Sequence, residues 1–167
     1  MNKLALAALT AVLCSGTAAL AASHADQTFM AKAIQGDMAE VQMGQMAQQK
    51  GGSDAVKSFG QMLISDHQAN EDQAKQVASQ IGMTPPSEPS AQQKADYAKL
   101  SKLSGSQFDR QFARMMVMDH RKDISEFKLQ ARNTKDSVGQ FASQTLPTLQ
   151  KHLQAAEKLE HNHSVSR

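Results

Sequence analysis

The 167-residue sequence contains few of the residues that cross-link chains, stack on ligands or break helices. It has one cysteine, no tryptophan, one tyrosine and four prolines. A single cysteine excludes an intramolecular disulfide, so packing of the core has to hold the fold together. The shortage of large aromatic side chains argues against a surface that stacks on sugars or nucleobases.

The sequence also lacks a large excess of charge of either sign. The chain has 18 lysines and arginines and 16 aspartates and glutamates, a net charge of +2, and the two signs are interspersed. Without a run of basic residues, the sequence predicts no nucleic-acid partner. No apolar stretch is long enough for a transmembrane helix, so we expect no membrane span.

The first residues, "MNKLALAALTAVLCSGTAALA", combine a lysine, a short apolar run and a small-residue Ala-x-Ala motif. This pattern is typical of a secretory signal peptide, which we assign to residues 1–21. The signal-peptide pattern predicts a protein that is exported, either into the periplasm or elsewhere outside the cytoplasm. An exported protein of this kind can also associate with the outer membrane. Cys14 is a candidate for lipid attachment, although Leu13 stands where such sites prefer a small residue. The remaining chain has the size of one domain, 22–160, followed by a frayed tail, 161–167.

Helix-forming residues fill the segments between the glycines and prolines. Ser53 and Asp54 are suited to the start of a helix, and Gly82 to an end. The prolines of "MTPPSEPS" exclude a helix there. We therefore predict four long helices and one short one, at 26–49, 54–81, 90–103, 106–132 and 136–160.

Each long helix carries one apolar stripe, with residues spaced alternately by three and four. Four such stripes predict a bundle around a common core. The connection over 83–105 is long enough to run the length of a helix, which leaves the helices on either side of it parallel. The predicted fold is therefore all-α: a ferritin-like four-helix bundle with a short crossover helix between the second and third long helices.

One titratable residue interrupts each apolar stripe near its middle. "FGQMLISDH" and "FARMMVMDH" end on His67 and His120, and the other two interruptions are Glu40 and His152. Counting along the helices at 1.5 Å per residue places all four at a similar depth. Three imidazoles and a carboxylate suit Zn²⁺, and imidazoles also suit copper and iron. One interpretation is thus a site for a single Zn, Cu or Fe ion.

Two other interpretations fit the same four residues. They are a structural layer of hydrogen-bonded core histidines, or a small-molecule or proton-linked site. Asp66 and Asp119 lie about 100° around the helix from their neighbouring histidines, so each either orients a histidine on another helix or faces solvent or the edge of a partner helix. Asn70 is a further candidate partner. Asp66, Asn70 and Asp119 are therefore our candidates for residues that hydrogen-bond to the four candidate ligands and orient them.

Six methionines at helical spacing are either core residues or thioether ligands for Cu(I). They are Met43, Met46, Met62, Met115, Met116 and Met118. Pro147, inside the last predicted helix, either kinks this helix or marks a break in it. The sequence does not decide either question.

Two stretches, "FMAKAIQGDMAEVQMGQMAQQKGGSDAVKSFGQMLISDH" and "FDRQFARMMVMDHRKDISEFKLQARNTKDSVGQFASQTLPTLQKHL", resemble an exported bacterial family called domain of unknown function 4142. "QGDMAEVQMG" and "TLPTLQKHL" are the most specific parts. The resemblance implies a ferritin-like bundle and a periplasmic or outer-membrane location. It implies little about activity. The Glu-x-x-His pattern of di-iron bundles is absent, since Ile64, Val117 and Leu149 stand three residues before the histidines.

The sequence favours a binding or structural protein of the cell envelope over an enzyme. It shows no paired nucleophile and base and no phosphate-binding loop. A metal-dependent oxidoreductase is the less favoured alternative. A second copy of the chain and another envelope protein are both possible partners.

Overall fold

The structure, a computed structural model, describes residues 23–165. The predicted signal peptide, Cys14 and the last two residues of the tail lie outside this range. The described residues form five α-helices: α1 (His24–Lys50), α2 (Asp54–Gln80), α3 (Ala91–Leu100), α4 (Gly105–Gln130) and α5 (Ser137–Val165). The all-α prediction is confirmed.

Most predicted helix ends agree with the structure to within three residues. The exception is the end of α5, which lies at Val165 rather than at 160. Pro147 lies inside α5 without ending it. Its ring removes one backbone donor, which leaves the carbonyl of Ser143 without its usual partner. Because Pro147 and Ser143 are both exposed, water can hydrogen-bond this carbonyl.

Local side-chain chemistry explains where the helices begin and end. The Ser53 hydroxyl accepts a hydrogen bond from the Val56 amide at the start of α2. Gly82 follows the last turn of α2 with a φ of 71°, in the left-handed region that glycine adopts without strain. The Met83 amide then donates to the Ala78 carbonyl at 2.9 Å, which closes the helix end. The predicted stop at Gly82 is thus present.

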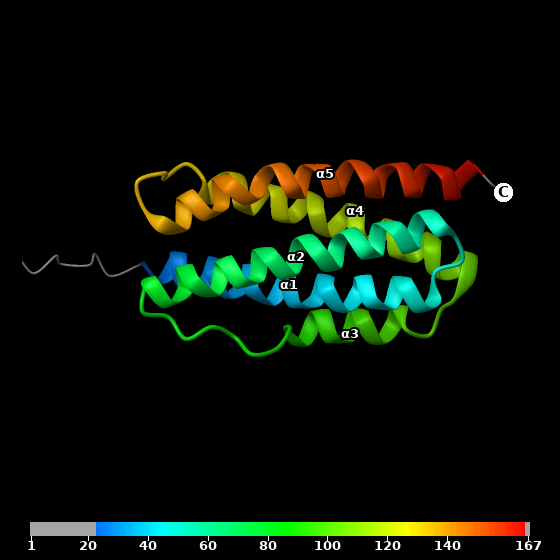
Figure 1. The fold of residues 1–167 in the computed structure, drawn as a ribbon, viewed down its shortest axis with the longest axis horizontal. Helices are drawn as coiled ribbons and strands as arrows, with labels where there is room; N and C mark the ends of the chain where they lie inside the picture. The colour runs from blue at the N-terminus through cyan, green and yellow to red at the C-terminus, as the bar shows by residue number, and fades with distance from the viewer. Residues whose placement is uncertain (1–22, 166–167) are drawn as a thin grey trace, which may run out of the picture.

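The four long helices form two antiparallel pairs, α1 with α2 and α4 with α5, as Figure 1 shows. Helix α2 packs on α5 and α1 packs on α4, while the short α3 lies against α1 and α4. After α2, the chain returns along the bundle through an extended segment and α3, so α2 and α4 run in the same direction. The Gly52 amide, in the turn before α2, donates to Asp109 of α4 at 2.8 Å. This hydrogen bond links the N-terminal end of α2 to that of α4.

A polar layer divides the core of the bundle in two. One apolar cluster contains Phe59, Phe108 and Phe112, and the other contains Phe29, Phe127 and Phe141. Seven buried polar residues belong to neither cluster: Asp37, Glu40, His67, Asp109, His120, Thr145 and His152. Burying so many polar groups costs free energy unless they find partners. Asp109 pairs with Gly52 at the start of α4, and the contacts of the other six define the candidate site.

Helices α1 and α2 approach closely at two glycines. A Cβ atom on Gly44 would lie 2.6 Å from the Gly60 carbonyl oxygen, and one on Gly60 would lie 2.8 Å from the Ala47 Cβ. Such distances are shorter than van der Waals contact, so any side chain at either position would force the helices apart. This contact fixes the spacing of α1 and α2, which carry Glu40 and His67.

None of the helices over residues 23–165 combines the length and the apolar character that crossing a bilayer requires.

Candidate metal centre

Three histidines from three helices meet in the polar layer. His67 of α2, His120 of α4 and His152 of α5 are at most 4 % exposed. One ring nitrogen from each lies within 4.8 Å of the others. The ring centroids are 5.1 to 5.9 Å apart. The bundle thus gathers three imidazoles that are far apart in the sequence.

His67 is held by a chain of polar groups. Its Nδ1 atom lies 2.8 Å from Asp37 Oδ1, and the Asn70 amide donates to the same carboxylate at 2.9 and 3.1 Å. The Thr145 hydroxyl donates to Asn70 Oδ1 at 2.8 Å. Because the Asp37 carboxylate accepts at Nδ1, the neutral form of the His67 ring carries its lone pair on Nε2.

The other two histidines are oriented in the same way. His120 Nδ1 lies 2.9 Å from the Met116 carbonyl oxygen, which can only accept. His152 Nε2 lies 2.9 Å from Asp66 Oδ2, and Lys151 donates to the same oxygen at 3.3 Å. The His120 Nδ1–H and His152 Nε2–H groups are therefore the donors, and the lone pairs lie on the opposite nitrogens.

Burial keeps two of the rings neutral. It lowers the pKa of His120 to about 3, with repulsion from His67 and His152 adding to the effect. Burial also lowers the pKa of His152 to about 4, although Asp66 favours its charged form. For His67, burial opposes charge, but the hydrogen bond to Asp37 and the charge of Glu40 outweigh it and raise the pKa. At neutral pH, His120 and His152 thus both carry free lone pairs.

These two lone pairs face each other. His120 Nε2 lies 3.3 Å from His152 Nδ1, and each has its proton on its other nitrogen. A hydrogen bond between them needs an additional proton, which the lowered pKa values of both rings oppose. Two nitrogens bound tetrahedrally to one Zn²⁺ at about 2.05 Å are about 3.3 Å apart. The observed separation suits a shared metal ion.

Glu40 lies beside the three histidines rather than among the converging nitrogens. Its Oε1 atom is 4.0 Å from His120 Nδ1, the nitrogen that faces the Met116 carbonyl. Its Oε2 atom is buried and, like His67 Nε2, has no hydrogen-bond partner among residues 23–165. Burial raises the pKa of Glu40 to about 8. The predicted role of Glu40 as a fourth metal ligand stays a prediction.

The three residues predicted to support the ligands differ in how they contact the histidines. Asp66 contacts the histidine of another helix, His152. Asn70 reaches His67 indirectly, through Asp37. Asp119 lies exposed at the surface of α4, and over residues 23–165 no hydrogen bond or ion pair joins it to a histidine.

Sequence reasoning missed Asp37, which contacts His67 directly. The clue was its position three residues before Glu40, because residues at this spacing share one face of a helix.

The six methionines mostly belong to the apolar core. Met43, Met46 and Met116 are buried in the cluster that contains Phe59, and Met62 and Met115 pack against it. Met118 is 64 % exposed. Met116 contributes its carbonyl oxygen to the site, where it accepts from His120.

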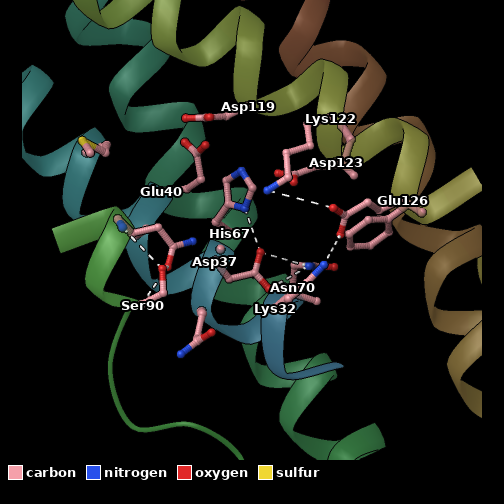
Figure 2. Close-up of a pocket in the computed structure, with 18 of the residues that line it drawn as sticks. Lys32, Asp37, Glu40, His67, Asn70, Ser90, Asp119, Lys122, Asp123 and Glu126 are labelled. Atoms are coloured by element: carbon pink, nitrogen blue, oxygen red, sulfur yellow. Dashed lines mark hydrogen bonds and ion pairs between the residues drawn. The ribbon is translucent and has the colours of Figure 1, made fainter. Parts of the chain in front are cut away.

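A cavity of about 420 Å³ adjoins the site between α1, α3 and α4. Figure 2 shows His67 and Glu40 in its wall, together with Asp37, Asp119 and Asp123. Burial, with a smaller contribution from the charge of Asp119, raises the pKa of Asp123 to about 7. Of the three site histidines, only His67 is among the described residues that line the cavity.

Sequence and structure comparisons agree with this architecture. The family described as "Domain of unknown function (DUF4142)" matches residues 13–159. The chain belongs to this family. No curated protein matches the chain. A crystal structure of a DUF305 fragment from Deinococcus radiodurans is similar, with a TM-score of 0.72 and 17% sequence identity. The similarity covers 84% of this chain and 98% of that one.

Membership in DUF4142 assigns no activity to the chain, because the family is defined as one of unknown function. The DUF305 similarity, at 17% identity, supports the helical-bundle fold alone. The chemistry of the site therefore has to be inferred from the residues of this chain.

Proposed function

We propose that this protein binds one transition-metal ion through His67, His120 and His152. The observation that carries the proposal is the 3.3 Å separation of His120 Nε2 and His152 Nδ1, both of which have lone pairs. A cation between them replaces a repulsive contact with two bonds. His67, whose Nε2 has no hydrogen-bond partner among the described residues, supplies a third ligand.

The surroundings of the histidines support the same proposal. In metal sites, the second ring nitrogen of a histidine usually donates to a carboxylate or a backbone carbonyl. All three histidines have such an acceptor, in Asp37, Asp66 and the Met116 carbonyl. A purely structural layer needs no such common arrangement.

Neutral imidazoles suit Zn²⁺, copper and iron, so these are the candidate ions. We place the binding outside the cytoplasm, in the periplasm or at the outer membrane, on the basis of the signal-peptide pattern in residues 1–21. The proposed role is binding of the ion.

The experiment is elemental analysis of untagged protein purified from the periplasm. We expect about one metal ion per chain in the wild type and a loss of most of it in His67→Ala, His120→Ala and His152→Ala. His24→Ala is the matched control, because His24 is an exposed histidine at the start of α1. Its metal content should equal that of the wild type.

Two results would support other functions. A wild type without metal, combined with a loss of about 1–3 kcal/mol of stability in each histidine variant, would favour the structural polar layer. Sustained consumption of oxygen or peroxide by protein loaded with iron or copper would favour an oxidoreductase.

A further inference from the structure

The cavity beside His67 is acidic, although the protein as a whole has a net charge of +2. Six carboxylate side chains line it, against two lysines, Lys32 and Lys122. Both lysines pair with the same residue, Glu126, at 3.4 and 4.0 Å. Asp96 pairs with Lys99 at 3.1 Å, and the other lining carboxyl groups have no lysine or arginine partner among residues 23–165, so acidic groups predominate in the cavity.

Three of these carboxylates mark a path from the surface to the histidines. Asp119 is exposed, Asp123 is half-buried, and Glu40 is 6 % exposed. Over residues 23–165, no ion pair joins any of the three to a lysine or an arginine. Figure 2 shows them around the ring of His67.

Two buried atoms at the inner end of the cavity point to a cationic ligand. Glu40 Oε2 and His67 Nε2 have no hydrogen-bond partner among the described residues, and their side chains are more than nine-tenths buried. Leaving buried polar atoms unpaired is costly. Both atoms can bind a cation, and both residues line the cavity.

We infer that this cavity is the route by which a hydrated divalent metal cation reaches the three histidines. Asp119 and Asp123 attract the hydrated cation. The Glu40 carboxyl group then releases its proton to water and replaces part of the water shell of the cation before His67 binds it. The inference rests on the proposed metal binding and adds the path and the order of contacts. It makes Asp119 and Asp123 residues that govern the rate of binding rather than ligands of the final site.

The test is the rate of Co²⁺ uptake by the metal-free protein, followed by stopped-flow absorption, because the chain has no tryptophan. In Asp119→Asn/Asp123→Asn we expect the association rate constant to fall about tenfold at low ionic strength, since lost steering slows capture. The difference should disappear in about 1 M salt, where charges are screened. The final absorption spectrum and stoichiometry should equal those of the wild type.

The matched control removes two carboxylates outside the cavity, in Asp72→Asn/Glu157→Gln. It keeps the same net charge as the test variant and should retain nearly the wild-type rate constant. An equal loss of rate in both double variants would overturn the inference, because it would show an effect of overall charge.

A second pair of variants tests the route by narrowing the cavity. Gly36 lines the cavity, and a Cβ atom there would meet no atom within 4 Å. Gly36→Leu places an aliphatic side chain in this space and replaces glycine with a good helix former, so the fold should be kept. We expect slower uptake in Gly36→Leu at every salt concentration, and nearly wild-type uptake in Gly36→Ala.

The remaining outcomes are distinct. Unchanged rates in both Asp119→Asn/Asp123→Asn and Gly36→Leu would show that the cation enters elsewhere, while leaving the histidine site intact. A changed final spectrum in the aspartate variant would show that these residues are ligands, which contradicts the inference. A wild type that binds no Co²⁺ would overturn the proposed function and, with it, this route.

Discussion

His120 Nε2 and His152 Nδ1 lie 3.3 Å apart in the buried centre of the bundle, and each ring has its proton on the side away from the other. Met116 and Asp66 impose this arrangement by accepting from the outer nitrogens. This arrangement leaves the two inner nitrogens without protons, and the contacts that support the proposed metal binding can be tested one by one.

Removing the charge of Asp66 should weaken metal binding without abolishing it. In Asp66→Asn, the side chain keeps an oxygen acceptor but orients His152 less firmly and reduces its basicity. We expect the affinity for Zn²⁺ to fall about 10–100-fold, the usual effect of losing such a partner. Competition with a chromophoric chelator measures it, with Asp72→Asn, an exposed change on the same helix, as the control. Equal affinities in both variants would contradict the role of Asp66.

Asp37→Asn should have a similar effect through His67. The Asp37 carboxylate accepts from His67 Nδ1 and from the Asn70 amide, so the substitution weakens the orientation of His67 at its buried end. We expect about 10–100-fold weaker Zn²⁺ binding, with saturation at high metal concentration still reaching one ion per chain. A variant that binds as tightly as the wild type would show that Asp37 stabilises the fold alone.

Glu40→Gln should change how stability depends on pH. The pKa of Glu40 is raised from 4.5 to about 8, so the folded state binds this proton more tightly than the unfolded state. The resulting stability is fully present below pH 4.5 and is lost as the pH rises through 8. Between pH 5 and 8, the metal-free wild type should lose on the order of 4 kcal/mol relative to Glu40→Gln.

Urea unfolding at the two pH values, with a chelator present, measures this difference. Glu157→Gln is the control, because its carboxylate is not buried in the core. Parallel pH profiles for the wild type and Glu40→Gln would show that Glu40 is not the source of the effect.

Two glycine substitutions should have opposite effects on stability. Gly60→Ala places a Cβ atom 2.8 Å from the Ala47 Cβ and should destabilise the protein by about 1–3 kcal/mol, because α1 and α2 have to separate. Gly36→Ala meets no atom within 4 Å and should stabilise α1 by up to about 1 kcal/mol. Urea unfolding measures both. A Gly60→Ala protein at least as stable as the wild type would refute the close contact.

Metal should stabilise the fold by mass action. At a free Zn²⁺ concentration 100-fold above the dissociation constant, the free energy of unfolding should rise by about 2.7 kcal/mol. Thermal unfolding with and without Zn²⁺ should show this increase in the wild type and in His24→Ala, but not in His120→Ala. An increase that persists in His120→Ala would place the ion elsewhere on the chain.

The sequence by itself determined the helices and the depth of the polar layer. Helix formation depends on residues close in the chain, so local signals such as Ser53 before α2 and Gly82 after it indicate helix ends. The spacing of apolar residues shows which face of each helix is buried, and His67, His120 and His152 lie on those faces.

Only the tertiary structure decided what each of these side chains touches. The direction of an imidazole depends on acceptors supplied by other helices, such as Asp37 for His67 and Asp66 for His152. Helical periodicity places a residue on a face but leaves open the rotation of neighbouring helices about their axes, which core packing sets. For the same reason the cavity over His67 was not predictable, because it exists only where α3 packs against α1 and α4.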